Sequence, residues 1–468
     1  MRDLLTGYDV NAPTWFYLSS LLIVAVFFRF GRVWSLRNID VVLLLSLAPG
    51  LLMVEPERLG IRVDEQAERY HLLRAWGTTW LFAGAGLVLV RLLCDPLFKR
   101  RPLIEPNLAA QGLVFLAISA FAFLMSKVIV DPPSSAARSA VTRGEGVLRR
   151  QDVSEPAAGA ASTAAGAAAT VVVEAVAPPR GSWRNRGRIR ELAAKIIPVV
   201  AHLAVVIGLY MVGLLHFGDR RQGVAMATLY LLMPCTSYDV GEVDHVLPAA
   251  FCILAFLAVR RPLLAGALMG GACGSLVLLP VFLALVPLWF AFYERRRGLL
   301  FAVSLVVVGG ALQVSVVALT SPDISEFSVR LQESVQAVVN EFMGETITEG
   351  GGAGVGFWNS NNLVYRIPVI VVFAVMLGVL TIWPRIKTLE HLISQTAAVV
   401  VATQFWYSHQ GGVYVLWYLP LLLLVVFRPR LASVHPSAAE PGAGWYEPIG
   451  SHVPVGPGLG PGGTRLWH

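Results

Sequence analysis

The chain has 468 residues, of which 56% are hydrophobic and only 14% charged, and its mean hydropathy is +0.64. This composition excludes a soluble globular protein, because apolar stretches near or above the roughly 18–20 residues that cross a bilayer recur along the chain. The net charge of +7 does not indicate a nucleic-acid partner, because the arginines stand mostly at the ends of apolar runs. The sequence therefore predicts an all-α polytopic integral membrane protein with about 11–13 membrane segments.

Four regions follow one another along the chain. Residues 1–130 hold four expected membrane helices, and residues 131–193 form an external loop. Within that loop the stretch 155–179 is rich in Ala and Gly, lacks aromatic residues and is expected to be a disordered insert. Residues 194–430 form a membrane core, and the Pro/Gly-rich tail 431–468 is expected to be unfolded.

The basic loops predict the orientation of the helices. Short loops with Lys and Arg favour the cytoplasm. They occur at 29–37, 99–102, 219–222, 260–262, 294–297, 384–387 and 428–430. All fall on one side if residues 262–293, which contain Gly270, Gly271, Gly274 and Pro280, form a broken hairpin that begins and ends there. Segment 180–195, with its five arginines, is the exception, because the same orientation places it outside.

The predicted external loops are 55–77, 131–192, 236–245, 321–362 and 408–412. The fourth contains an amphipathic helix by its spacing of apolar residues at 327, 331, 335, 338, 339 and 342. The third contains the segment SYDVGEVDH (237–245), which places Asp239, Glu242, Asp244 and His245 between two apolar runs. A simple connector does not need three acids and a histidine, so this segment is the first candidate site.

Three stretches of the C-terminal half resemble a family of bacterial C-type (GT-C) glycosyltransferases, the polyprenyl-phosphate-mannose-dependent mannosyltransferases. The block 262–303, beginning PLLAGALMGGACG, is similar to a family segment that follows a G-Q-x-N motif and one helix, and here GEVDH (241–245) stands at that motif. The stretch FWNSNNLVYRIP (357–368) is similar to a second motif, with Asn359, Ser360, Asn361 and Arg366 matching. The stretch QFWYSHQGGVYVLWYLP (404–420) resembles a third, with His409 at the position of a family histidine.

Three departures from the family stand beside the resemblance. Glu242 and Asp244 replace the Gln and Asn of the motif, and residues 275–279 read SLVLL where the family has a basic residue. The catalytic aspartate of the family's first external loop cannot be placed by motif within residues 1–130.

The resemblance implies transfer of a mannose-like sugar from a polyprenyl-phosphate donor to an acceptor at the outer face of a bacterial plasma membrane. Such a reaction needs a carboxylate that takes the proton of the acceptor hydroxyl, and groups that stabilise the departing phosphate. The candidate bases are Glu242, Asp244, Asp64 and Asp131. The candidate substrate-binding residues are His245, Asn359, Asn361, Arg366 and His409.

Other interpretations stay open. The acids of the segment could be solvated, with Asp244 as the N-cap of the next helix, and Asp131 could simply end a helix. Asp239, Glu242, Asp244 and His245 could instead bind a divalent cation, so the cofactor is left open. The alternative to an enzyme is a non-catalytic membrane subunit of the same fold. Membrane lipids are expected partners, and the oligomeric state is not predicted.

Overall fold

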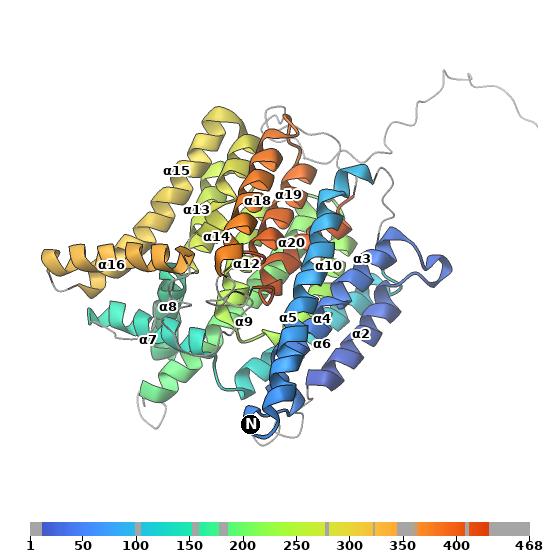
Figure 1. Ribbon diagram of the computed structural model, residues 1–468, viewed down its shortest axis with the longest axis horizontal. Helices are drawn as coiled ribbons and strands as arrows, with labels where there is room; N and C mark the ends of the chain where they lie inside the picture. Colours follow the sequence, from blue (N-terminus) through green and yellow to red (C-terminus); the bar gives the residue numbers. More distant parts are fainter. Residues whose placement is uncertain are drawn as a thin grey trace, which may run out of the picture.

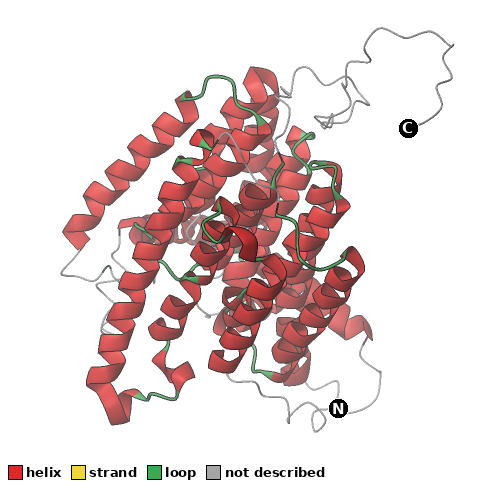
Figure 2. Ribbon diagram, turned by 90° about the vertical axis from the view of Figure 1, so that its right-hand side faces the viewer, coloured by secondary structure: helices red, strands yellow, loops and turns green. Residues whose placement is uncertain are grey.

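The computed structural model describes residues 12–98, 104–151, 159–176, 186–276, 280–321, 323–343, 358, 363–407 and 411–429. Throughout these residues the regular structure is helical, with no strand (Figure 2). Six helices are long and apolar enough to cross a membrane: Leu36–Val54, Gln66–Leu93, Ala110–Val130, Arg186–Leu215, Val286–Thr320 and Val364–Ile382. The protein is thus an all-α multi-pass membrane protein.

The first part of the chain forms helices on one side of the bundle (Figure 1). They are α2 (Ala12–Phe27), η1 (Phe30–Arg32), α3 (Leu36–Leu45), α4 (Leu47–Val54), η2 (Pro56–Leu59), α5 (Val63–Leu93), η3 (Asp95–Leu97) and α6 (Ala110–Val130). Two further helices follow, α7 (Ser135–Arg149) and α8 (Ala160–Val176).

The remaining helices complete the bundle. They are α9 (Arg186–Leu215), α10 (Arg220–Leu232), α11 (Pro234–Tyr238), α12 (Val243–Leu257), α13 (Pro262–Gly274), α14 (Pro280–Leu283), α15 (Val286–Thr320), α16 (Ile324–Met343), α18 (Leu363–Ile382), α19 (Leu389–Thr403) and α20 (Val415–Phe427). Helices α10, α19 and α20 are buried along most of their length, whereas α18 exposes apolar side chains. Helices α7 and α16 lie across the direction of the long helices (Figure 1).

The expected hairpin over 262–293 begins and ends at the same end of the bundle. The Tyr293 hydroxyl, at its last residue, donates a hydrogen bond to the Val259 carbonyl just before its start (2.6 Å). The backbone turns at Glu294, where φ is 63°. This contact confirms the hairpin on which the predicted orientation depends.

The amphipathic helix expected in the loop 321–362 is also confirmed, as α16. In contrast, the expectation that 155–179 is a disordered insert is wrong for residues 160–176, which form α8. Alanine is the best helix former, and the small side chains let α8 pack closely on α7. A Cβ added at Gly166 would lie 2.1 Å from the carbonyl oxygen of Ala140, and one added at Gly144 would lie 2.3 Å from the amide nitrogen of Ala167.

A buried ion-pair network joins the N-terminal helices to the last one. Arg91 of α5 donates to both carboxylate oxygens of Asp40 on α3 (2.7 and 3.0 Å) and to Asp95 (3.0 Å). Asp95 also pairs with Arg428, directly after α20. These charges lie at one end of the bundle. Residues 237–245 lie at the opposite end, which we call the site end.

Candidate functional site

The segment 237–245 is a tight connection between two buried helices. Helix α11 ends at Tyr238, and α12 begins at Val243 with Glu242 in the N-cap position. The interpretation of Asp244 as the N-cap is therefore wrong. Asp244 instead lies in the first helical turn, where a negative charge is favoured by the helix dipole.

Side chains from α6 and from the start of α7 hold the backbone of this segment. Lys127 of α6 donates to the Ser237 carbonyl (3.1 Å), and Ser134, the N-cap of α7, donates to the Gly241 carbonyl (3.0 Å). Within the turn the Glu242 amide donates to the Asp239 carbonyl (3.0 Å). A solvated connector would not be tied at several backbone carbonyls, so the segment is a fixed part of the bundle.

A buried histidine of α9, His202, holds the same turn in place. The Nε2 atom of His202 is 3.1 Å from the Val240 carbonyl oxygen, and its Nδ1 is 2.9 Å from the Tyr230 hydroxyl. Because a carbonyl oxygen only accepts, Nε2 carries the proton, and Nδ1 accepts from the Tyr230 hydroxyl. The backbone beside Asp239 is thereby anchored to α9 and α10.

The two most buried charged groups of the segment form a pair. The Oδ2 atom of Asp239 lies 3.3 Å from Nδ1 of His245, and the side chains are 4% and 12% exposed. The atoms attract as an ion pair, although they are not aligned for a full hydrogen bond. Asp239, rather than Glu242 or Asp244, is thus the acid that orients the histidine.

Glu242 stands at the start of α12, partly exposed. Burial raises the pKa of the Glu242 carboxyl, and the charges of Asp239 and Asp244 raise it further, against the opposing effect of His245. A carboxylate with a raised pKa is a better proton acceptor near neutral pH. Glu242 therefore has the electrostatic environment of a general base.

Aromatic rings of α20 and of the residues before it pack against this segment. The ring of Tyr414 lies 4.7 Å from that of His245 and is stacked on Trp417 at 4.2 Å. The Trp417 indole donates to the backbone carbonyl of Asp244 (2.8 Å), and Tyr407 packs edge-on against Tyr414. Helix α20 and the residues after α19 thus form an aromatic wall beside the acids.

Arg366 lies at the site end but is held by the residues that follow α19. It is buried in the first turn of α18, and its Nε donates to the Trp406 carbonyl (2.7 Å). Because Tyr407 follows Trp406 and contacts Tyr414, Arg366 is linked to His245 through the aromatic wall.

The remaining candidates are not brought into this cluster by any described contact. Asp131 is exposed and is the C-cap of α6, three residues before Ser134. Asp64 belongs to the first turn of α5, but its side chain is outside the described residues, as are Asn359, Asn361 and His409. Glu242, Asp244 and His245 lie close together within segment 237–245.

The divalent-cation interpretation gains no support from the geometry. Among the described residues, no three side chains of His, Cys, Asp or Glu come together in a group that could hold a metal ion. Asp239 is turned to His245 instead of converging with the other acids on one point.

Sequence reasoning named Asp239 only as a possible cation ligand and predicted neither its pairing with His245 nor the aromatic wall. Asp239 stands at the end of a helix that begins with Pro234, and a residue at such a position can point inward or outward. Tyr407, Tyr414 and Trp417 read as an aromatic belt in the sequence. The resembling stretch 404–420 contains all three aromatic residues, but only the packing of α20 on α12 brings them to His245.

Searches of protein-family models, of curated proteins and of solved structures give no match to this chain.

Proposed function

We propose that this protein is a membrane glycosyltransferase that moves a mannose-like sugar from a polyprenyl-phosphate donor to an acceptor hydroxyl at the outer face of a bacterial plasma membrane. The observation that carries the proposal is the juxtaposition of Glu242 with the Asp239–His245 pair at the site end. The choice of sugar and donor rests on the resemblance of residues 241–245, 262–303, 357–368 and 404–420 to that family of transferases.

In the proposed reaction the acceptor oxygen attacks the anomeric carbon, and the bond between that carbon and the phosphate oxygen breaks. Glu242 takes the proton of the acceptor hydroxyl. His245, which the Asp239 carboxylate favours in its protonated form, donates a hydrogen bond to the departing phosphate. Asp244 binds a sugar or acceptor hydroxyl. Polyprenyl phosphate and the glycosylated acceptor are the products, so atoms and charge balance without a further reactant.

The test uses the purified full chain in lipid vesicles with polyprenyl-phospho-sugar donors, and measures released polyprenyl phosphate. Glu242→Gln keeps the shape of the side chain and removes its charge, so turnover should fall by about 10²–10⁴-fold. Asp244→Asn should reduce turnover as well. Glu326→Gln, which removes an acid of α16 paired with Arg330, is the matched control and should retain full turnover. Normal turnover in both site variants would contradict the proposal.

A second candidate is a non-catalytic subunit of the same fold. It is favoured by the sequence SLVLL at 275–279, which offers no cation where the resembling family has one. Turnover by the unmodified protein rules this candidate out. Absence of turnover with every donor, from folded protein, supports it.

A further inference from the structure

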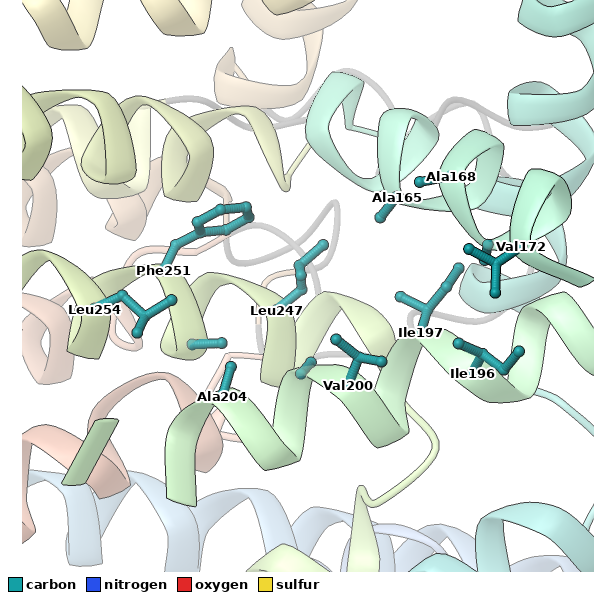
Figure 3. Close-up of a pocket in the computed structure, with 13 residues that line it drawn as sticks. Ala165, Ala168, Val172, Ile196, Ile197, Val200, Ala204, Leu247, Phe251 and Leu254 are labelled. Atoms are coloured by element: carbon teal, nitrogen blue, oxygen red, sulfur yellow. The ribbon is translucent and has the colours of Figure 1, made fainter. Parts of the chain in front are cut away.

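A wholly apolar groove of about 390 Å³ lies between α8, α9 and α12 (Figure 3). Its wall on α12 is made by Leu247, Ala250, Phe251 and Leu254. Its volume falls in the range of about 300–1,000 Å³ that small-molecule sites occupy. No polar side chain lines it, so it matches a hydrocarbon chain in polarity.

The groove opens toward the lipid-facing side of the bundle. Val171 on α8 and Val200, Leu203 and Ile207 on α9 are between 40% and 56% exposed. Helix α9 is one of the six long apolar helices, so we expect its exposed side chains to meet the hydrocarbon of the bilayer. Small residues on all three helices, such as Ala168, Ala204 and Ala250, leave the groove open between larger neighbours (Figure 3).

The face of α9 that lines the groove also carries two arginines, nearer the start of the helix. Ile197, Ala201 and Ala204 line the groove, and Arg190 and Arg186 precede Ile197 by seven and eleven residues. Such spacing places residues on one face of a helix. The two arginines therefore stand above the groove, on the same stripe of α9.

The surroundings of these arginines are basic. Residues 134–151, 159–176 and 186–195 contain eight Arg or Lys and three Glu. One of these acids, Glu145 of α7, is buried and pairs with both Arg149 (2.6 Å) and Arg190 (2.5 Å), while the Arg190 side chain stays 47% exposed. Arg186 and Arg190 belong to the basic segment 180–195, whose external position the charge rule for short loops does not explain. It fits an anionic headgroup.

We propose that this groove and the arginines above it bind one anionic phospholipid of the bilayer, with an acyl chain between α8, α9 and α12 and the phosphate at Arg186 and Arg190. The site is separate from the proposed glycosyl transfer. His245 packs on Tyr414 of α20, and Leu247, two residues later, is about 200° away around the axis of α12. The groove thus lies on the other side of α12 from His245, the group proposed to bind the phosphate of the sugar donor, which argues against the tail of that donor as its occupant.

Helix α8 is part of this site and is fixed against the bundle. Helix α8 supplies one wall of the groove through Ala165, Ala168, Ala169 and Val172. Ser162, near the start of α8, donates to the Ser275 carbonyl (2.8 Å) and fixes that wall to the end of α13.

The experiment is native mass spectrometry of the purified full chain in a non-ionic detergent, titrated separately with phosphatidylglycerol, phosphatidylcholine and polyprenyl phosphate. We expect phosphatidylglycerol to bind more tightly than phosphatidylcholine. Arg186→Gln and Arg190→Gln should each weaken phosphatidylglycerol binding by about fivefold. Ala168→Phe and Ala204→Phe narrow the groove at positions that are not fully buried, and each should weaken binding by at least about tenfold.

Two control variants match these changes. Val371→Phe adds an aromatic ring to an exposed position of α18, and Arg330→Gln removes a paired arginine of α16. Both should bind phosphatidylglycerol as the unmodified protein does. Equal binding of the two phospholipids, unchanged binding by both Phe variants, or preference for polyprenyl phosphate would each overturn the proposal. Because the readout is lipid binding, a protein without transferase activity still gives a valid result.

Discussion

The Asp239 carboxylate lies 3.3 Å from the Nδ1 atom of His245, across the turn that leads into α12. This pair converts a cluster of four polar residues into an ordered group, because it fixes which acid orients the histidine and leaves Glu242 and Asp244 for other partners. It also changes the expected effect of mutating Asp239, which as an isolated loop acid would matter little.

Asp239→Asn should lower transfer activity and change its dependence on pH. The Asp239 carboxylate favours the protonated imidazole, so its removal should shift the alkaline limb of the rate profile to lower pH. The measurement is kcat against pH for the unmodified protein and the variant. A purely structural role of Asp239 would reduce the amount of folded protein but leave the limb where it is.

Glu242→Gln should make the protein more stable at neutral pH. The raised pKa means that the folded state binds the Glu242 proton more tightly than the unfolded state does. The contribution of this proton to stability is present at low pH and is lost as pH rises through the folded pKa. Thermal unfolding in detergent should therefore show a gain for the variant that is absent near pH 4 and grows with pH. A constant difference across that range would contradict the assignment.

Gly166→Ala should destabilise the protein, because the added Cβ would lie 2.1 Å from the Ala140 carbonyl oxygen. Overpacking of this kind costs about 1–3 kcal/mol of unfolding free energy. Gly310→Ala is the matched control, since nothing lies within 4 Å of its Cβ position in α15. The control should be neutral or stabilising by up to about 1 kcal/mol, through helix propensity. Comparable unfolding temperatures for the two variants would argue that α7 and α8 do not pack as described.

Asp95→Asn should be among the most destabilising single changes. It leaves Arg91 and Arg428 buried with one carboxylate fewer, and breaking a buried ion pair in this way costs about 3–5 kcal/mol. Glu326→Gln breaks the partly exposed pair with Arg330 and should cost less than about 1 kcal/mol. Urea or thermal unfolding of the two variants measures the difference in their unfolding free energies. Equal losses would show that the buried network stabilises the protein no more than the partly exposed pair does.

Reporter fusions test the orientation. A reporter after Arg297 or Lys387 should read cytoplasmic, and one within 340–355 should read external, because short basic loops stay in the cytoplasm. The hydrogen bond from Tyr293 to Val259 places both ends of the hairpin on one side, so an external signal after Arg297 would reverse every loop, including 237–245.

The sequence by itself determined the properties that depend on the residues within one segment of the chain. Runs of apolar residues predicted a multi-pass helical protein, although six helices of the described residues, against about 11–13 expected segments, are long and apolar enough to cross a membrane. The spacing of apolar residues predicted α16, and Gly and Pro predicted the break in the hairpin 262–293. It also located the polar segment 237–245, because charged residues are rare in this chain.

The tertiary structure alone decided which residues meet. Asp239 pairs with His245 because α11 ends with that side chain turned inward, and the aromatic wall reaches His245 only because α20 packs on α12. Low complexity suggested disorder for 155–179, yet Gly166 and Gly144 let α8 approach α7 closely enough to be buried. Composition does not encode such contacts, because the free energy of a close helix pair depends on the partner's surface as much as on the helix itself.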